Sequence, residues 1–539
     1  MIKKILPIIL LTSMFTLTPN KLENSRIINE RHSTTELGEY GDSSSVTLAS
    51  DRTNVLIKLS DDILDKYTVN NYPLRTDFKT YQKEKFENHN NKFLDLLTVK
   101  YDDIYISKYS SYIEFTFEKE STEKLEFTLK ELVKHDFIEK IYLQDDCKPE
   151  EMLGGGKMDS GTTDSLITSL DGGEDIKVGL LEWGICDKNN ANLSSSNITC
   201  RDEWYFIESK TEHATLMASI LVGDDGMVPN AHLYSVQLSG NPVSEVDWLI
   251  DKGISVCNVS IGDGTGSYSS SSSYLDYAAD TYGITFCCAT GNDGDENGYV
   301  SNFAMANNCI AVGAGSESGV VDYTSRITPN GEVRPMVIGP DTVAVDNMTN
   351  IYYGGTSVAT AICTGVVALI QQNKQDIMFN PHIIRALLMV NCSEIEGYDF
   401  LSNGFYECGG GAGRINLQSC IDNYYIRYFH NDGAKNSSLY KINMPYNFFV
   451  GQTWKMVLSY STNVVNDAPV RTQYGLKLID INTDVVELQR NIVNDGFEMI
   501  HWHVETYQQL SITTYQIGSK LYDETDSGYI AIKIEEPEE

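Results

Sequence analysis

The sequence predicts an α/β domain built on a parallel sheet, preceded by a small α+β unit and followed by a C-terminal β-sandwich. In residues 176–424, short apolar runs alternate with helical stretches, the pattern of a parallel sheet covered on both faces. Residues 53–148 mix strand and helix periods. Residues 425–537 hold many short strand-like runs with little helical periodicity, which favours a sandwich.

Composition supports a folded protein of several domains. The chain has 539 residues, of which 41% are hydrophobic and 22% charged, values typical of globular proteins. Its 75 acidic side chains outnumber the 41 Lys and Arg, for a net charge of −34. Such a surface repels phosphate backbones, so nucleic acid is not an expected partner.

The first 20 residues have the pattern of a secretory signal peptide. Lys3 and Lys4 precede an apolar run over residues 5–17, which is shorter than a membrane-spanning helix requires. We therefore expect a secreted or cell-surface protein with no membrane span in the mature chain. An uncleaved anchor stays open, because no clear small-x-small cleavage site follows. Residues 21–52 are polar and are predicted to be a linker.

Each later region contains recognisable elements. The α+β unit has strand-like runs at 55–59, 112–117 and 138–143 and helical spacing at 86–97 and 125–133. A glycine-rich junction follows at 149–175. The main domain has buried-strand runs at 178–181, 233–238, 254–261 and 284–289. The sandwich is predicted from runs at 448–450, 454–460, 476–479, 510–517 and 529–534.

Eleven cysteines form an odd set, so one thiol at least is unbridged or pairs with another chain. Cys287 and Cys288 lie in an apolar run and are expected to be buried thiols. Cys186 and Cys200 are a candidate disulfide, although sequence spacing does not settle the connectivity. No Cys/His cluster has zinc spacing, so neither a metal nor another cofactor is expected.

Ser357 follows two glycines and opens a long apolar stretch, Thr-Ser-Val-Ala-Thr-Ala-Ile. Glycines allow a sharp turn into a helix, and the first helical turn offers unpaired N–H groups and a positive dipole. A hydroxyl placed there is suited to attack a carbonyl carbon. The structural alternative is a serine that caps a buried helix.

Residues 355–359, Gly-Thr-Ser-Val-Ala, resemble the nucleophile signature of the subtilisin-like serine proteases, the subtilases. Three more segments follow that family's order: 178–185 with Glu182, 213–219 with His213, and 289–292 with Asn292. Segments 228–234, 258–262 and 411–416 are also similar, so the likeness covers about 245 residues, 176–420. It implies a three-layer subtilisin-like domain.

The resemblance also implies the chemical roles. Ser357 would be the nucleophile, His213 the base that takes its proton, and Glu182 the acid that orients the imidazole. Asn292 would donate to the oxyanion, and the substrate backbone would lie along Ser260, Ile261 and Gly262. The other histidines of this domain, His232 and His382, stand in no motif and are expected to have structural places.

Glu182 departs from the family, which has an aspartate there. One extra methylene moves a rigidly held carboxylate by roughly 1 Å, a displacement that can cost about 10²-fold in rate. Ser-His-Glu triads nevertheless operate in α/β-hydrolases. A working triad and a weakened enzyme therefore both stay open, and Asp187 is a possible substitute acid.

Two acidic segments have alternative interpretations. Asp293, Asp295 and Glu296 follow the oxyanion segment, and they either favour a basic residue before the scissile bond or form a solvated loop. Asp224 and Asp225 precede a glycine and are read as a solvated turn rather than a calcium site.

These observations predict a secreted serine endopeptidase, made as a zymogen, that acts on polypeptide substrates. Residues 53–148 resemble the propeptide of secreted subtilases, which inhibits its own enzyme and is removed by it, here within 148–165. The alternative is an inactive pseudoprotease that serves as a surface binding or structural module. The C-terminal sandwich is expected to cap the catalytic domain or to bind a surface, and the oligomeric state is left open.

Overall fold

The computed structural model describes residues 52–59, 104–118, 138–144, 148–149, 160–201, 211–294, 298–316, 319–321, 323–329, 335–340, 342–346, 351–395, 409–423, 425–431, 440–461, 463–465, 468–470, 473–484, 486–490, 496–517 and 526–537, with Thr80, Lys83 and Phe86. The predicted signal peptide, nearly all of the linker and the helix expected at 125–133 lie outside these residues.

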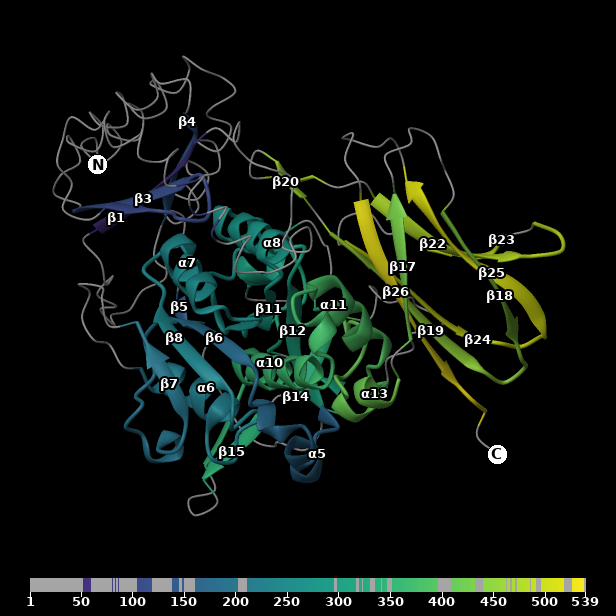
Figure 1. Cartoon of the computed structure of the whole chain (residues 1–539), viewed down its shortest axis with the longest axis horizontal. Coiled ribbons are helices and arrows are strands. Elements are labelled where there is room, and N and C mark those ends of the chain that lie inside the picture. The colour runs from purple at the N-terminus through teal and green to yellow at the C-terminus, as the bar shows by residue number, and fades with distance from the viewer. Residues whose placement is uncertain are drawn as a thin grey trace, which may run out of the picture. The chain divides into compact units, whose positions relative to one another are not determined.

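An eight-stranded sheet forms the centre of the main domain, in the order β13-β12-β11-β9-β6-β8-β7 with β14 beside β12 (Figure 1). Neighbouring strands of this sheet run parallel, except β12 and β13, which are antiparallel. This confirms the predicted parallel α/β fold. The strands are β6 (Lys177–Glu182), β7 (Asn197–Cys200), β8 (His232–Gln237), β9 (Val256–Val259), β11 (Thr285–Ala289), β12 (Ile310–Ser316), β13 (Gly319–Val320) and β14 (Val337–Pro340).

Four of these strands, β6, β8, β9 and β11, were expected from their apolar runs, whereas β12 was not. Its sequence, Ile-Ala-Val-Gly-Ala-Gly-Ser, is rich in residues with low strand propensity. The small residues suit the packing, because a Cβ on Gly313 would lie 2.7 Å from Cγ of Pro335. Close packing, rather than local propensity, therefore places this strand.

Helix α10 (Thr356–Asn373) is the central helix of the domain. It contacts β9, β11, β12, β14 and helix α6, and it is buried from Thr356 to Gln371, as expected of a helix that is apolar on every side. The other helices are α5 (Asp164–Ser169), α6 (Glu212–Val222), α7 (Val243–Lys252), α8 (Ser270–Tyr282), α11 (Pro381–Val390), α13 (Leu417–Asp422) and the short η6 (Asp171–Gly173), η7 (Ala191–Leu193), η8 (Phe303–Met305) and η9 (Gln375–Ile377). Within the described helices, none combines the length and apolar character needed to cross a membrane.

The N-terminal region contributes an antiparallel sheet in the order β2-β3-β1-β4. Its strands are β1 (Arg52–Leu59), β2 (Ile104–Ile106), β3 (Tyr112–Glu118) and β4 (Ile138–Gln144). This sheet belongs to one compact unit with Ser239–Trp248, the segment that contains most of α7. Inside that unit, Oδ2 of Asp247 accepts hydrogen bonds from the hydroxyls of Tyr105 (2.8 Å) and Ser107 (2.6 Å).

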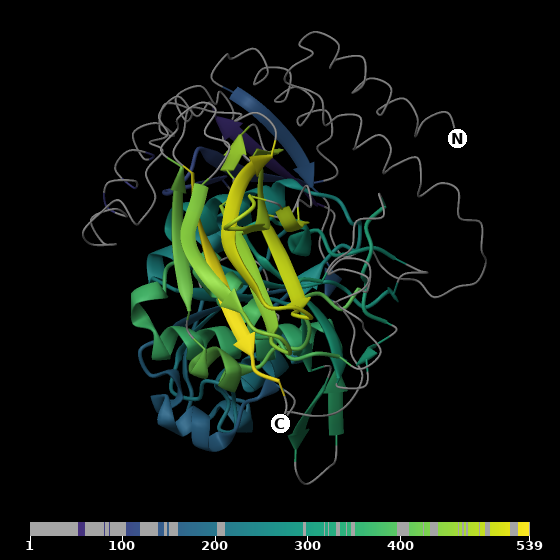
Figure 2. The same ribbon diagram turned by 90° about the vertical axis from the view of Figure 1, so that its right-hand side faces the viewer.

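Two four-stranded antiparallel sheets form the C-terminal region, ordered β17-β26-β19-β24 and β18-β25-β22-β23 (Figures 1 and 2). One hydrophobic cluster, which includes Trp454, Leu476 and Ile512, lies between them. The strands are β17 (Ile426–Asn431), β18 (Tyr440–Phe448), β19 (Thr453–Tyr460), β22 (Gln473–Asp480), β23 (Val486–Arg490), β24 (Phe497–His503), β25 (Gln508–Ile517) and β26 (Asp526–Glu535). Three small pairs complete the structure: β5 (Lys148–Pro149) with β10 (Ile261–Gly262), β15 (Thr342–Asp346) with β16 (Ile351–Gly354), and β20 (Asn463–Val465) with β21 (Ala468–Val470).

Arg385 joins the C-terminal sheets to the main domain. It comes from α11, which contacts β19 and β26, and its side chain is fully buried. Its guanidinium donates to Oγ of Ser459 (3.0 Å) and to the carbonyl oxygens of Tyr460 (3.1 Å), Gly496 (2.7 Å) and Asn307. A single side chain thus satisfies acceptors on both sides of this junction.

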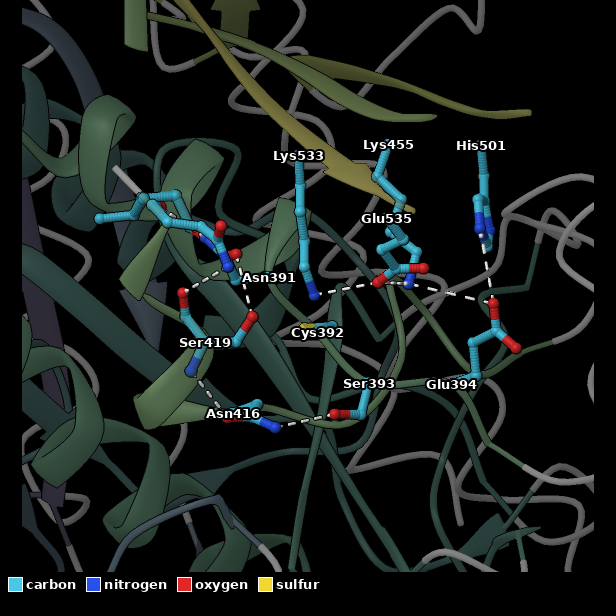
Figure 3. A network of polar contacts seen from close by, with 12 residues as sticks. Asn391, Cys392, Ser393, Glu394, Asn416, Ser419, Lys455, His501, Lys533 and Glu535 are labelled. Atoms are coloured by element: carbon cyan, nitrogen blue, oxygen red, sulfur yellow. Dashed lines mark hydrogen bonds and ion pairs between the residues drawn. The ribbon is translucent and has the colours of Figure 1, made fainter. Parts of the chain in front are cut away.

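A second set of polar contacts lies at the same junction (Figure 3). Glu394, just after α11, is paired with Nζ of Lys455 (3.9 Å) and Nε2 of His501 (3.5 Å), both on C-terminal strands. Lys455 and Lys533 also pair with Glu535, at 3.2 and 3.0 Å. The C-terminal sheets are therefore bound to the main domain through the buried contacts of Arg385 and these ion pairs, in which Glu394 is exposed, as well as through apolar packing.

Candidate active site

Glu182 is the last residue of β6 and is completely buried. The carboxyl ends of parallel strands meet at one edge of the sheet, the edge where α/β proteins place their sites. The register puts Leu181 opposite Val259 of β9, and Val259 opposite Cys288 of β11. The residues that follow these three strands therefore emerge side by side.

His213 is the second residue of α6 and lies in the first turn of that helix. Thr211 caps this helix, because its Oγ1 accepts the N–H of Ala214 at 3.1 Å. Nδ1 of His213 lies 2.9 Å from Oε2 of Glu182. A carboxylate can only accept, so the proton is on Nδ1 and the lone pair is on Nε2. The longer side chain of glutamate thus reaches the imidazole.

The substitute acid, Asp187, has a different place. Its Oδ1 accepts the N–H of Asn189 at 3.1 Å, and its own N–H donates to Oγ1 of Thr215 at 2.9 Å. These contacts close the turn that follows Glu182. The structure accordingly brings Glu182 to the imidazole, while these contacts of Asp187 serve the turn.

Ser357 lies in the first turn of α10, directly after a backbone turn that requires glycine. Gly355 has φ 114° and ψ 170°, a conformation that side-chain-bearing residues rarely adopt. Oγ of Ser357 donates to the carbonyl oxygen of Ser260 at 3.2 Å, and Oγ of Ser260 donates to the carbonyl oxygen of Ser357 at 3.0 Å. This reciprocal pair joins the predicted nucleophile to the predicted substrate strand.

Asn292 lies just beyond β11 and is held by Thr356. Its Oδ1 accepts both the main-chain N–H and the hydroxyl of Thr356, each at 2.9 Å. Since an N–H can only donate, these contacts identify the oxygen of the amide and place Nδ2 at the opposite end. Thr356 also accepts the N–H of Gly291 at 3.2 Å. This role of Thr356 has no signal in the sequence beyond its position immediately before Ser357.

Residues Ser260, Ile261 and Gly262 follow β9 and are all buried. A Cβ on Gly262 would lie 1.8 Å from Oγ of Ser301, so only glycine fits. Ile261 and Gly262 form β10, which pairs antiparallel with Pro149 and Lys148. This edge can therefore take up an extended peptide as an additional strand.

The remaining sequence candidates have structural or exposed positions. Nε2 of His232 lies 2.9 Å from Oγ1 of Thr199, and burial, with the nearby Lys177, lowers the pKa of this histidine. His382 is buried in α11. Asp293 is exposed, while Asp295 and Glu296 fall outside the described residues.

Within the residues that the structure describes, no group of three or more His, Cys, Asp or Glu side chains is arranged to hold a metal ion. Asp224 and Asp225 are both exposed.

The chain is similar to several known proteins. Subtilisin E from Bacillus subtilis (strain 168) is 26% identical over 274 residues, which cover 46% of this chain and 66% of that protein, slightly under two thirds. Pyrolysin from Pyrococcus furiosus is 25% identical over 243 residues, covering 36% of this chain and 17% of pyrolysin. Fervidolysin from Fervidobacterium pennivorans, a keratinolytic enzyme related to subtilisin, has a TM-score of 0.49 at 14% identity, over 89% of this chain and 88% of that one. The model of the subtilase family matches residues 109–406, more than half of the 539 residues, and the chain therefore belongs to the subtilase family.

Proposed function

We propose that this chain is a serine endopeptidase that cleaves polypeptides with Ser357, His213, Glu182 and Asn292. The observation that carries the proposal is the 2.9 Å contact between His213 Nδ1 and Glu182 Oε2. It leaves the basic nitrogen of the ring, Nε2, as the acceptor for a serine proton. The packing of α6 against α10, the helices that carry His213 and Ser357, supports the same arrangement.

In the proposed reaction, Nε2 of His213 takes the hydroxyl proton of Ser357 while Oγ attacks the scissile carbonyl carbon. Nδ2 of Asn292 and the N–H of Ser357 stabilise the oxyanion of the tetrahedral intermediate. His213 then delivers the proton to the leaving amine, and an acyl-enzyme remains. A water molecule then attacks the acyl-enzyme in the same way, and the carboxylic acid product is released. Glu182 keeps Nδ1 protonated and stabilises the imidazolium without becoming protonated itself.

A zymogen is part of this proposal. The dipeptide Lys148–Pro149 lies on β10 as an antiparallel strand, where a substrate would lie. In the N-terminal compact unit, Asp247 of α7 binds Tyr105 and Ser107 of the N-terminal sheet region. Both contacts support the assignment of 53–148 as an inhibitory propeptide.

The pairing also narrows the proposed cleavage window of 148–165. In this antiparallel pair, Lys148 faces Gly262 and Pro149 faces Ile261. Ser260 directly precedes Ile261, and its carbonyl oxygen accepts the hydroxyl of Ser357. We therefore place self-cleavage at the start of that window, just beyond Pro149.

One set of measurements tests the proposal. A fluorophosphonate should label the wild-type protein and Ser194→Ala, an exposed control, but not Ser357→Ala. Intact mass should show maturation within residues 148–165 in the wild type and in Ser194→Ala, but not in Ser357→Ala. If folded Ser357→Ala still matured in purified form, the proposal would be wrong. A folded wild-type chain that is neither labelled nor processed would support the pseudoprotease alternative instead.

Export to the cell exterior or surface completes the proposal and rests on residues 1–20. Fractionation of cells that express the full chain should recover it outside the cytoplasm. Deletion of residues 2–20 should retain it inside, and equal distribution of both forms would contradict export.

A further inference from the structure

Two cysteine sulfurs meet at the sheet edge that carries Glu182. Sγ of Cys186 and Sγ of Cys200 are 4.0 Å apart, too far for a disulfide and close enough for a thiol–thiol contact. Sγ of Cys200 also lies 3.7 Å from the carbonyl oxygen of Cys186, to which it donates. The two residues belong to different segments, the turn after β6 and the end of β7.

The backbone holds both cysteines through one residue of β8. Cys200 is the registered neighbour of Ser235 in the parallel β7–β8 pair. The N–H of Cys186 donates to Oγ of Ser235 at 3.2 Å, and the N–H of Arg201 donates to its carbonyl oxygen at 3.0 Å. A disulfide has an S–S length of about 2.05 Å, so each sulfur would move by roughly 1 Å, which side-chain rotation can supply.

Accessibility distinguishes Cys200 from the other described cysteines of the main domain. All nine cysteines within the described residues are buried, but Cys200 is 9% exposed, whereas Cys287 and Cys363 are at 0%. The segment between the pair runs over the surface, with Ser194 and Ser195 exposed. A small oxidant can therefore approach Cys200 without opening the core.

We propose that Cys186 and Cys200 are a site of oxidative modification, which a low-molecular-weight disulfide such as oxidised glutathione converts into an intramolecular disulfide. The thiolate of Cys200 attacks one glutathione sulfur and releases one reduced glutathione. The thiolate of Cys186 then attacks the mixed disulfide at the Cys200 sulfur and releases the second. The two protein thiols are oxidised by two electrons, and their protons end on the two released thiols.

The rate of this exchange depends on pH. The hydrogen bond with Cys200, followed by burial, raises the pKa of Cys186 above the ordinary value for a thiol. The thiolate of Cys186, which closes the bridge in the second step, is therefore scarce at neutral pH, and bridging accelerates as pH rises.

The bridge would stabilise the turn that connects Glu182 to His213. In that turn, the carbonyl oxygen of Ile185 accepts the N–H of Thr211 at 3.2 Å, and the N–H of Asp187 donates to Thr215 at 2.9 Å. Both threonines belong to the start of α6, beside the imidazole. Closing residues 187–199 into a loop would hold this region together. Any effect of the bridge on peptidase activity rests on the proposed function.

The test compares the full chain treated with oxidised glutathione and with dithiothreitol. Oxidation should remove two hydrogens from the intact mass, and a non-reducing digest should link the peptides that contain Cys186 and Cys200. Cys186→Ser and Cys200→Ser should each abolish this linked peptide, whereas the core variant Cys309→Ser should keep it. The oxidised form should melt roughly 5 °C higher than the reduced form.

The wild-type digest decides the proposal even if a variant fails to fold. Complete alkylation of both cysteines after oxidation, or a bridge from either one to a third cysteine, would overturn it. The inactive variant Ser357→Ala should form the same bridge. If the folded wild-type chain forms the bridge but has no peptidase activity, the proposed function is rejected while this site is retained.

Discussion

Nδ1 of His213 and Oε2 of Glu182 are 2.9 Å apart, which is the distance of a charge-assisted hydrogen bond. The acid is completely buried at the end of β6, and its second oxygen, Oε1, has no hydrogen-bond partner among the described residues. The carboxylate is thus oriented through its contact with the histidine. This arrangement makes the length and charge of residue 182 directly testable.

Shortening the acid should weaken the enzyme. Glu182→Asp withdraws the carboxylate by roughly 1 Å, so we expect kcat to fall about 10²-fold. Glu182→Gln should cost about 10⁴-fold, because the amide no longer selects the productive tautomer. Initial rates on a peptide substrate measure both, with the exposed Glu174→Asp as control. Full activity of Glu182→Asp would contradict the orienting role.

Thr356 should act through Asn292. Asn292→Ala is expected to lower kcat by about 10²–10³, the known cost of losing this donor in subtilisin itself. Thr356→Ala removes one of the two contacts to Oδ1 and should cost less, roughly 10-fold, mainly in kcat rather than KM. Thr360→Ala, one turn further along α10, is the control. An equal loss at both threonines would indicate a general helix defect.

Gly355 should be intolerant of a side chain. Its φ of 114° is strained for alanine, so Gly355→Ala should destabilise the fold by about 1–3 kcal/mol and displace Ser357. Urea unfolding and kcat measure the two effects. Gly319 has φ 148° with open space around it, so Gly319→Ala should lose stability while kcat is retained. Unchanged kcat in Gly355→Ala would show that the turn does not position the serine.

Stability should fall in mild acid because of His382. Burial first, and the charge of Arg385 second, lower the pKa of this histidine well below its ordinary value. The folded state therefore stays neutral while the unfolded chain takes up a proton below about pH 6.5. The contribution of His382 to the free energy of unfolding is fully present above pH 6.5. It declines as pH falls, by at most about 1.4 kcal/mol per pH unit.

His382→Leu should flatten this dependence between pH 7.5 and 5.5, as measured by urea unfolding. The exposed His503→Leu serves as control and should keep the wild-type slope. Identical slopes in all three proteins would contradict the prediction.

Loss of Arg385 should weaken the attachment of the C-terminal sheets to the main domain. Arg385→Ala leaves buried carbonyl groups without their donor, and we expect a loss of about 3–5 kcal/mol. Arg385→Lys keeps the charge but cannot reach all the acceptors, so its loss should be smaller. Limited proteolysis near residue 424 together with urea unfolding measures both. Wild-type resistance in Arg385→Ala would show that apolar packing alone secures the junction.

Several features could be predicted because they are encoded locally. The runs of β6, β8, β9 and β11 are continuous and apolar, as expected of strands buried on both faces. The glycines before Ser357 mark a turn into a helix, and the ordered segments with Glu182, His213 and Asn292 gave the family. The C-terminal antiparallel sheets were likewise visible as repeated short strands.

Other features depend on residues far apart in the chain and have no local pattern. The small residues of β12 have low strand propensity, and their close packing against Pro335 is visible only in the tertiary structure. The contact of Thr356 with Asn292 and the four acceptors of Arg385 each join separate segments.

By itself, the sequence determined which chemical groups this subtilase carries and in which order they occur. Tertiary structure decided which of them meet, that glutamate reaches the imidazole and that Asp187 serves a turn instead. The physical reason is that residue types and periodicity describe a neighbourhood of a few residues, whereas hydrogen bonds and packing act over a few ångströms in space, wherever the chain returns.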